Sequence, residues 1–387
     1  MDFRENDEQG QLRRTLRQFL ERQAPTRTVA ELDRAGRYPR DIVDGIAALG
    51  VWGMCISETY GGSGADTLSV AVACEELQRA GGCIASAVTP TMTFCAPGVE
   101  RWACPEVRAR LLPELAAGRL RMSIGLSEPD VGSDLAAIGM RAEPVDGGFL
   151  VSGSKTWATG ADVADYIFAL VRTGPAGSGY RGLSVLLLPR AELSMTITPI
   201  PKLAGQATHS CEIRIDNGFV PAQYLVGELN RGADVVLPLL EMERVICAAQ
   251  CVGMAQGAYD TAVAYAAQRM QFGRPVIEHQ AIGHLLVEMA ADVECARLVA
   301  YHAAWEMESP TAAQAATSAM AKLVCSQIAS SVASRGMSVM GAYSYSPDYP
   351  MERYYREVKL FEIAGGTSHI LKNIIAKRLR PGPVASW

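Results

Sequence analysis

Residues 237–275 read LPLLEMERVICAAQCVGMAQGAYDTAVAYAAQRMQFGRP, and this stretch decides the fold. Because it is long and mostly apolar, it predicts one buried helix that ends near Phe272. Small residues recur at every fourth position along it: Ala249, Gly253 and Gly257. This spacing places them on one face of the helix, where a neighbouring helix can approach closely.

A carboxylate interrupts the apolar face near the start of this helix. Glu243 is flanked by apolar residues, and a buried carboxylate is costly unless it is paired or functional. Arg244 is adjacent, but successive residues point about 100° apart around a helix, so the two do not automatically pair. Two interpretations stay open: an ion pair on a solvated face, or a catalytic carboxylate.

The composition bounds the class of protein. A chain of 387 residues is long enough for two or three domains, and its net charge of −5 argues against nucleic acid as the main partner. No apolar run approaches the length of a membrane span, and the polar start MDFRENDEQ lacks the apolar segment of a signal peptide. The ten cysteines include no C-x-x-C pair, and no spacing predicts a metal site. We therefore expect a cytoplasmic protein with reduced thiols and no metal.

The pattern divides the chain into three regions. Residues 1–120 predict helices, which begin at Asn6, run from Pro39 to Gly50, from Ala65 to Arg79, and from Pro105 to Ala117. Residues 121–227 predict short strands, with a hairpin turn at Asp146-Gly147-Gly148. Residues 228–387 predict helices that form a bundle, over 237–272, 278–307, 311–340 and 367–379.

Two polar stretches in the middle region are candidate binding loops. Residues 124–134, IGLSEPDVGSD, follow a strand and offer main-chain donors to a ligand, although an ordinary surface loop has the same composition. Residues 153–160, GSKTWATG, carry Trp157, and packing in a core is the usual role of tryptophan.

Two further stretches lie in the C-terminal region. Arg269 at the end of the long helix could serve only to complement the helix dipole. Residues 356–370 read REVKLFEIAGGTSHI. In the order in which they occur, the E-R pair, the R-x-x-F-G segment, both middle-region loops and this last stretch resemble motifs of acyl-CoA dehydrogenases along essentially the whole chain.

The resemblance implies the fold and the reaction. It implies an α+β protein with an N-terminal helical domain (1–120), a middle β-barrel-like domain (121–227) and a C-terminal four-helix bundle (228–387). It implies FAD as cofactor and the α,β-dehydrogenation of an acyl thioester to the enoyl thioester.

The resemblance also assigns flavin contacts residue by residue. Leu126 and Ser127 would contact the pyrimidine edge of the isoalloxazine, and Ser133 would bind the FAD pyrophosphate. Trp157 would lie against the flavin, and the hydroxyl of Thr159 would reach the region of N5.

Other family positions imply an oligomer. Arg269, with Gln271 and Phe272, would reach the FAD phosphates of a neighbouring subunit, so a homotetramer or a homodimer is expected. Gly341 begins the run that meets the adenine side of FAD, and Thr367 would also contact FAD.

The position of the catalytic base departs from the commonest family pattern. The usual glutamate is replaced by Gly365, which taken alone suggests a non-catalytic protein that binds acyl thioesters. A branch of the family that includes isovaleryl-CoA dehydrogenase instead carries its base beside the E-R pair, at the position of Glu243. By this resemblance Glu243 removes the α proton, and the Gly365 N–H binds the thioester oxygen.

Substrate and partners follow from the same branch. It implies a short or branched acyl-CoA, and electron-transferring flavoprotein or another acceptor for the electrons. Gln206 replaces an arginine of the family pattern and Ser338 replaces a glutamine, which leaves an acyl carrier protein thioester open as substrate. A flavin monooxygenase or oxidase, and an enoyl-thioester reductase, are the alternative activities on this scaffold.

Overall fold

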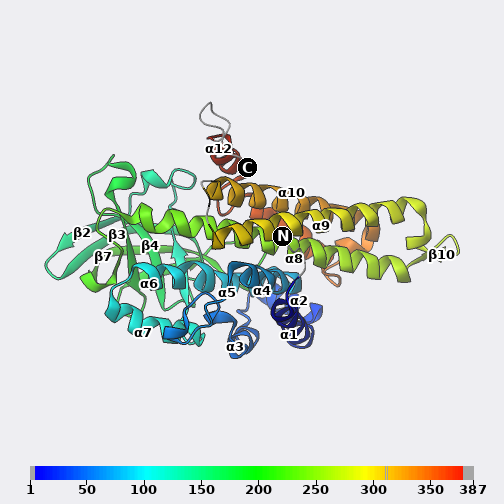
Figure 1. The fold of residues 1–387 in the computed structure, drawn as a ribbon, viewed down its shortest axis with the longest axis horizontal. Coiled ribbons are helices and arrows are strands. Elements are labelled where there is room, and N and C mark those ends of the chain that lie inside the picture. Colours follow the sequence, from blue (N-terminus) through cyan, green and yellow to red (C-terminus); the bar gives the residue numbers. More distant parts are fainter. Residues whose placement is uncertain (1–4, 310, 312, 378–387) are drawn as a thin grey trace.

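The structure is a computed structural model that describes residues 5–309, 311 and 313–377. A sheet domain forms one end of an elongated molecule, and long helices lie side by side toward the other end (Figure 1). Three of these helices, in the C-terminal region, are α8 (Gly232–Gln268), α9 (Gln280–Glu308) and α10 (Gln314–Met340). Within the described residues, no helix is both long and apolar enough to cross a membrane.

The N-terminal region is helical, as predicted. Its helices are α1 (Asp7–Gln23), α2 (Thr26–Ala35), α3 (Arg40–Ala48), α4 (Thr67–Ala80), α5 (Gly82–Thr89), the π-helix η3 (Pro90–Cys95), α6 (Ala96–Trp102) and α7 (Pro105–Ala116). The capping box at Asn6 is confirmed, because its side chain accepts from the Gln9 N–H at 2.8 Å and its own N–H donates to the Gln9 side chain at 3.1 Å. The helix predicted from Pro39 is the third rather than the second, because α2, which the sequence did not predict, precedes it.

The middle region is a mixed sheet. Its strands are β1 (Met122–Gly125), β2 (Arg141–Val145), β3 (Gly148–Thr159), β4 (Tyr166–Arg172), β5 (Leu183–Pro189), β6 (Met195–Pro199), β7 (Ser210–Pro221) and β8 (Leu225–Val226). They are ordered β6-β7-β3-β2-β4-β5-β8, and β1 pairs with β4 in parallel. The predicted hairpin turn is confirmed, because Val145 pairs with Gly148 across Asp146-Gly147.

The central helix α8 is longer than predicted at its start and shorter at its end. It stops at Gln268, and the chain then forms a hairpin of β9 (Met270–Gln271) and β10 (Arg274–Pro275). The close approach at its small residues is confirmed. A Cβ on Gly253 would lie 2.1 Å from the carbonyl oxygen of Glu75 in α4, so only glycine fits there.

The remaining elements follow the bundle helices. They include α11 (Met351–Glu357), η9 (Val358–Glu362) and α12 (Ser368–Ala376). The last of these is the helix predicted over 367–379, of which residues 378 and 379 lie outside the described part. The helix α12 packs against α10, and α4 of the N-terminal region packs against α8 and α9.

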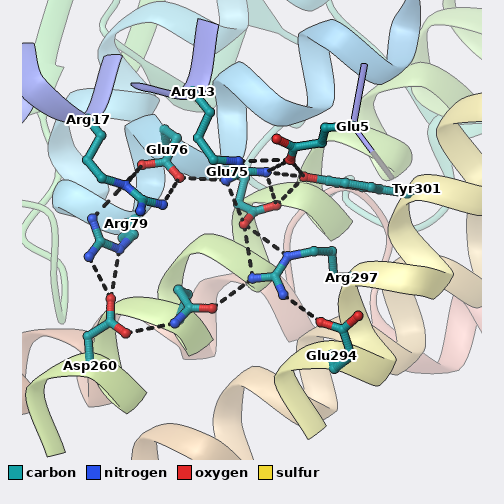
Figure 2. A network of polar contacts seen from close by, with 11 residues as sticks. Glu5, Arg13, Arg17, Glu75, Glu76, Arg79, Asp260, Glu294, Arg297 and Tyr301 are labelled. Carbon is teal, nitrogen blue, oxygen red and sulfur yellow. Dashed lines mark hydrogen bonds and ion pairs between the residues drawn. The ribbon is translucent and has the colours of Figure 1, made fainter. Parts of the chain in front are cut away.

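A network of charged side chains joins the N-terminal helices to the bundle (Figure 2). Glu75 and Glu76 of α4 are buried, and they receive hydrogen bonds from residues of α1 and α9. Arg13 donates to Glu75 at 3.0 Å and to Glu76 at 2.5 Å, and Arg297 donates to Glu75 at 3.2 Å. Arg79 of α4 also donates to Asp260 of α8 at 2.6 Å, so the network spans four helices and fixes α8 and α9 against the N-terminal helices.

Candidate active site

The two binding loops of the middle region are joined by direct hydrogen bonds. The Thr156 N–H, in β3, donates to the Ser127 carbonyl at 2.9 Å. Lys155 is fully buried, and its ammonium donates to the Leu126 carbonyl at 3.2 Å and to the Glu128 carboxylate at 2.8 Å. Burial lowers the pKa of Lys155 to about 8, although Glu128 acts to raise it. The two motifs therefore form one unit.

Sequence reasoning missed Lys155 and Glu128 as the residues that join these loops. Glu128 also accepts from the backbone N–H groups of Gly139 at 2.8 Å and Met140 at 2.9 Å, so its carboxylate organises the whole turn after β1. The signal that could have found the pair is a charged residue of opposite sign in each of the two loops, both flanked by small or apolar residues.

Trp157 is displayed rather than packed in a core. Its side chain is 56% exposed, its φ is +59°, and it lies where the pairing of β3 with β7 shifts register between Lys155 and Ala158. A positive φ is strained for a bulky residue, and such strain is concentrated at functional sites. Nearby, the Thr159 hydroxyl lies 3.3 Å from that of Ser210. The interpretation of Trp157 as a core residue is wrong.

The hydrogen-bond donors of the loop over residues 124–134 fit an anionic cofactor that is rich in hydrogen-bond acceptors. Within the described residues, neither Ser127 nor Ser133 donates a hydrogen bond through its N–H or its hydroxyl. Free donors beside an exposed indole ring suit a planar heteroaromatic ligand that carries phosphates. The residues expected to contact FAD in this region are therefore compatible with it.

The structure brings Glu243 and Gly365 together. A Cβ on Gly365 would lie 3.9 Å from the carboxyl carbon and one carboxylate oxygen of Glu243. The thiol of Cys247, one turn further along α8, would lie 3.7 Å from the same point. Gly365 and Gly366 both have positive φ, at +63° and +97°, a conformation that favours glycine. The two predicted catalytic positions, far apart in sequence, thus face one small volume.

The Glu243 carboxylate is partly buried, and no described residue forms a direct ion pair with it. Burial raises the pKa of Glu243, and the positive charges of Arg244 and Lys322 only partly oppose this. Arg244 is itself buried and donates no hydrogen bond to any described residue, and burial lowers its pKa. The interpretation of Glu243 as half of a surface ion pair is therefore not supported.

Lys322 of α10 is a third residue that the sequence did not reveal. It is fully buried, and its ammonium donates to the carbonyl oxygens of Ala364 at 2.6 Å and Gly366 at 2.7 Å. These two carbonyls flank Gly365. Thr367 follows them and caps α12, because its hydroxyl accepts from the Ile370 N–H at 3.3 Å.

A second group of predicted residues lies at the far end of the bundle. The hairpin of β9 and β10 projects there, away from the sheet (Figure 1). Arg269 lies over the ring of Tyr343 at 5.3 Å, next to the turn that contains Gly341. Gln271 is exposed and Phe272 is 94% exposed. Within one chain, the structure does not bring these residues to the loops around Trp157.

The two departures from the family pattern have local explanations. The side chain of Gln206 donates to the Lys202 carbonyl at 2.6 Å, so it closes its own loop instead of projecting outward. Ser338 is exposed, and its hydroxyl donates to the Ser334 carbonyl one turn earlier in α10. Neither residue directs a charge outward.

Known protein-family models match all three regions of the chain. Three domain models of acyl-CoA dehydrogenases match: the N-terminal domain at residues 6–119, the middle domain at 123–218 and the C-terminal domain at 230–380. The chain belongs to the acyl-CoA dehydrogenase family. This confirms the family, the three-domain fold and FAD-dependent acyl-CoA dehydrogenation, whereas the catalytic branch is not decided by it.

Individual relatives span the full chain. Benzylmalonyl-CoA dehydrogenase of Aromatoleum aromaticum is 34% identical over 98% of this chain and 100% of its own length. Glutaryl-CoA dehydrogenase of Desulfococcus multivorans is 31% identical, with 97% of both chains covered. A subunit of the caffeyl-CoA reductase–Etf complex of Acetobacterium woodii is 31% identical over 97% of this chain and 98% of its own.

Solved acyl-CoA dehydrogenase structures superpose closely. A glutaryl-coenzyme A dehydrogenase in complex with glutaryl-CoA has a TM-score of 0.94 at 30% identity, covering 98% of this chain and 96% of the other. Butyryl-CoA dehydrogenase from Megasphaera elsdenii has a TM-score of 0.93 at 29% identity, covering 98% and 100%. The family's cofactor is FAD, so this chain is an FAD-dependent oxidoreductase.

Proposed function

We propose that Glu243 is the general base of this acyl-CoA dehydrogenase and that the Gly365 N–H binds the thioester oxygen. One observation carries the proposal: the Glu243 carboxylate lies 3.9 Å from where a Gly365 side chain would begin. Two carboxylates in that space would repel each other, so a glycine at 365 is the complement of a glutamate at 243.

The chemistry follows from what these groups offer. A thioester α proton is weakly acidic, and the enolate-like transition state places charge on the carbonyl oxygen. The Gly365 N–H donates to no described residue, so it is available for that oxygen. Burial raises the pKa of Glu243, which makes the carboxylate a stronger base than an exposed glutamate. When bound, FAD supplies the hydride acceptor for the β carbon.

The test replaces the base without changing its size. In Glu243→Gln we expect FAD content to be unchanged and flavin reduction to slow by about 10²–10⁴-fold, the usual cost of losing a general base. Anaerobic stopped-flow absorbance with saturating butyryl-CoA or isovaleryl-CoA measures the rate. Glu241→Gln, two residues earlier in α8, is the matched control and should stay near the wild-type rate. A near-normal rate in Glu243→Gln would remove Glu243 from the mechanism.

We further infer a short or branched acyl-CoA as substrate and an electron-transferring flavoprotein as acceptor. The relatives named above act on benzylmalonyl-CoA and glutaryl-CoA, and one works in a complex with Etf. The same stopped-flow assay with acyl chains of four to twelve carbons, on CoA and on acyl carrier protein, separates the carriers and the chain lengths.

A homo-oligomer completes the proposed cofactor site. Phe272 and Met270 expose apolar side chains on a projecting hairpin, which is typical of a surface that contacts another subunit. Arg269 directly precedes this hairpin, which lies at the opposite end of the molecule from β3, the strand that carries Trp157 (Figure 1). These positions support a site in which Arg269, Gln271 and Phe272 meet the FAD of a neighbouring subunit.

The reverse reaction is the second candidate. The relative from Acetobacterium woodii is named as a reductase, and a group that removes a proton in one direction returns it in the other. Dithionite-reduced enzyme mixed with an enoyl-CoA would reoxidise and yield the saturated thioester if the chain works in this direction.

A further inference from the structure

We infer that Lys322 of α10 is a positioning residue for this site: it orients the Gly365 N–H and supplies positive charge beside the Glu243 carboxylate. The inference deepens the proposed function and rests on it. Lys322 touches neither reacting atom, so it acts only through the backbone turn and through its charge.

Lys322 orients the Gly365 N–H through the geometry of the peptide bond. In a trans peptide the carbonyl of one residue and the N–H of the next point in opposite directions. The described chain contains no cis peptide bond, and the Ala364 carbonyl is held by Lys322 at 2.6 Å. The Gly365 N–H, in the same peptide plane, must therefore point away from Lys322. The second bond, to the Gly366 carbonyl at 2.7 Å, holds the Gly366–Thr367 peptide, so both peptides on either side of the Gly365–Gly366 peptide are fixed by Lys322.

The turn needs this support because little else holds it. Gly365 and Gly366 lack side chains, and neither N–H donates to a described residue. Two adjacent glycines lose the most conformational freedom on ordering, so an unsupported turn would sample other orientations. A buried ammonium that bonds both flanking carbonyls restricts that sampling, and a misplacement of about 1 Å at a reacting group can cost about 10²-fold in rate.

Titratable and charged groups from two elements face the Lys322 ammonium. Those on α8 are Glu243, Arg244, Cys247 and Cys251, and the one on η9 is Glu362. No described carboxylate lies within ion-pair distance of Lys322. Its charge is therefore not neutralised locally, and it favours the ionised form of Glu243. Cys95 of η3 also faces Glu243, but its thiol stays protonated because burial raises its pKa.

Two variants separate the bonds from the charge. Lys322→Met removes both, whereas Lys322→Gln keeps N–H donors and removes the charge. Ser326→Ala is the matched control, because Ser326 is buried one turn along α10 and bonds only within its helix. All are assayed as FAD-loaded enzyme, with absorbance confirming FAD content.

The main readout is proton exchange without dehydrogenation. 3,3-Dimethylbutyryl-CoA has α protons but no β hydrogen, so its deuterium uptake from D₂O, followed by mass spectrometry, reports only the base and the oxyanion donor. We expect Lys322→Met to slow exchange by about 10²-fold, as for loss of an oxyanion donor, and Lys322→Gln to recover part of it. In both variants the acid limb of the pH profile moves to higher pH, because Glu243 loses a favourable charge. Ser326→Ala should match wild type.

The outcomes are distinct. Exchange within threefold of wild type in both Lys322 variants would overturn the inference. The inference would also be overturned if exchange slowed equally in Lys322→Met and Lys322→Gln and the acid limb of the pH profile did not move. That result would mean that Lys322 has only a structural role. If Lys322→Met does not retain FAD, the exchange rate and pH profile of Lys322→Gln alone test the inference. If Glu243→Gln exchanges normally, the proposed function itself has failed, which no result on Lys322 can mimic.

Discussion

Charged side chains gather at two places along α8, and they are paired at only one of them. In the network of Figure 2, Glu76 receives hydrogen bonds from Arg13 and Arg17. Burial of Glu76 acts to raise its pKa, but these bonds outweigh that effect and lower it. Three turns from the Gly253 contact, Glu243 has no direct partner among the described residues, and burial raises its pKa. The pKa values of the fully buried Glu76 and the partly buried Glu243 thus shift in opposite directions.

The difference shows how the molecule divides stability from chemistry. A carboxylate surrounded by guanidinium groups is locked in its ionised form and cannot exchange a proton at neutral pH. A carboxylate left with only distant positive charges keeps its basicity, at a cost in folding free energy. We therefore expect substitutions in the network to change stability and substitutions near Glu243 to change activity.

The largest effect on stability is expected from Glu76→Gln. Removing the charge leaves Arg13 and Arg17 facing a neutral group, and breaking a buried ion pair from one side typically costs about 3–5 kcal/mol. Chemical denaturation of the FAD-loaded enzyme measures the loss. Glu294→Gln is the control, because its exposed pair with Arg297 should contribute less than about 1 kcal/mol. Flavin reduction should stay near wild type in both, and a large loss of activity in Glu76→Gln would contradict the division.

The pair of Lys155 and Glu128 is an intermediate case, because it is paired and yet supports the proposed flavin loops. Lys155→Met leaves the Glu128 carboxylate with only the N–H groups of Gly139 and Met140, so a loss of about 3 kcal/mol is expected. FAD retention should fall with it, as measured by absorbance after gel filtration. The double variant with Glu128→Gln should recover part of the stability. If the single variant is as stable as wild type, this ion pair does not hold the loops.

The long elements were predictable from local pattern, and the shorter helices between them were not. The apolar run of α8 and its small residues predicted both the helix and its close contact with α4. Residues 82–102 predicted no element, because glycines and prolines at their start and centre resemble breaks. They form α5, η3 and α6 nonetheless, because tertiary burial outweighs local propensity, and a π-helix accommodates the Pro90 segment.

The residues of the candidate site that belong to a sequence motif were predictable, whereas the residues identified only by a contact in the folded chain were not. Glu243 and Gly365 were found because one departure from the family pattern implied the other. Lys155 and Lys322 were missed because their partners are 27 and 42 residues away in sequence. A lysine that bonds a backbone carbonyl has no partner type to search for, since every residue carries that group. Only the folded backbone reveals it.

The smallest effect expected on stability is also the sharpest test of the comparison, and it comes from Glu243→Gln. A carboxyl whose pKa is raised in the folded state binds its proton more tightly there than when unfolded, so its ionisation opposes folding as the pH rises above 4.5. Glutamine removes that penalty. The variant should be as stable as wild type or slightly more so at pH 8, by less than about 1 kcal/mol, and the difference should vanish toward pH 4.5.

Glu76→Gln should behave in the opposite way, because a lowered pKa gives stability that is complete above 4.5 and is lost below it. Denaturation of both variants from about pH 3 to pH 8, a range that extends below the ordinary pKa of glutamate, gives the two profiles. A Glu243→Gln protein that is markedly less stable than wild type at pH 8 would show that this carboxylate is paired after all, and the two sites would then not differ in kind.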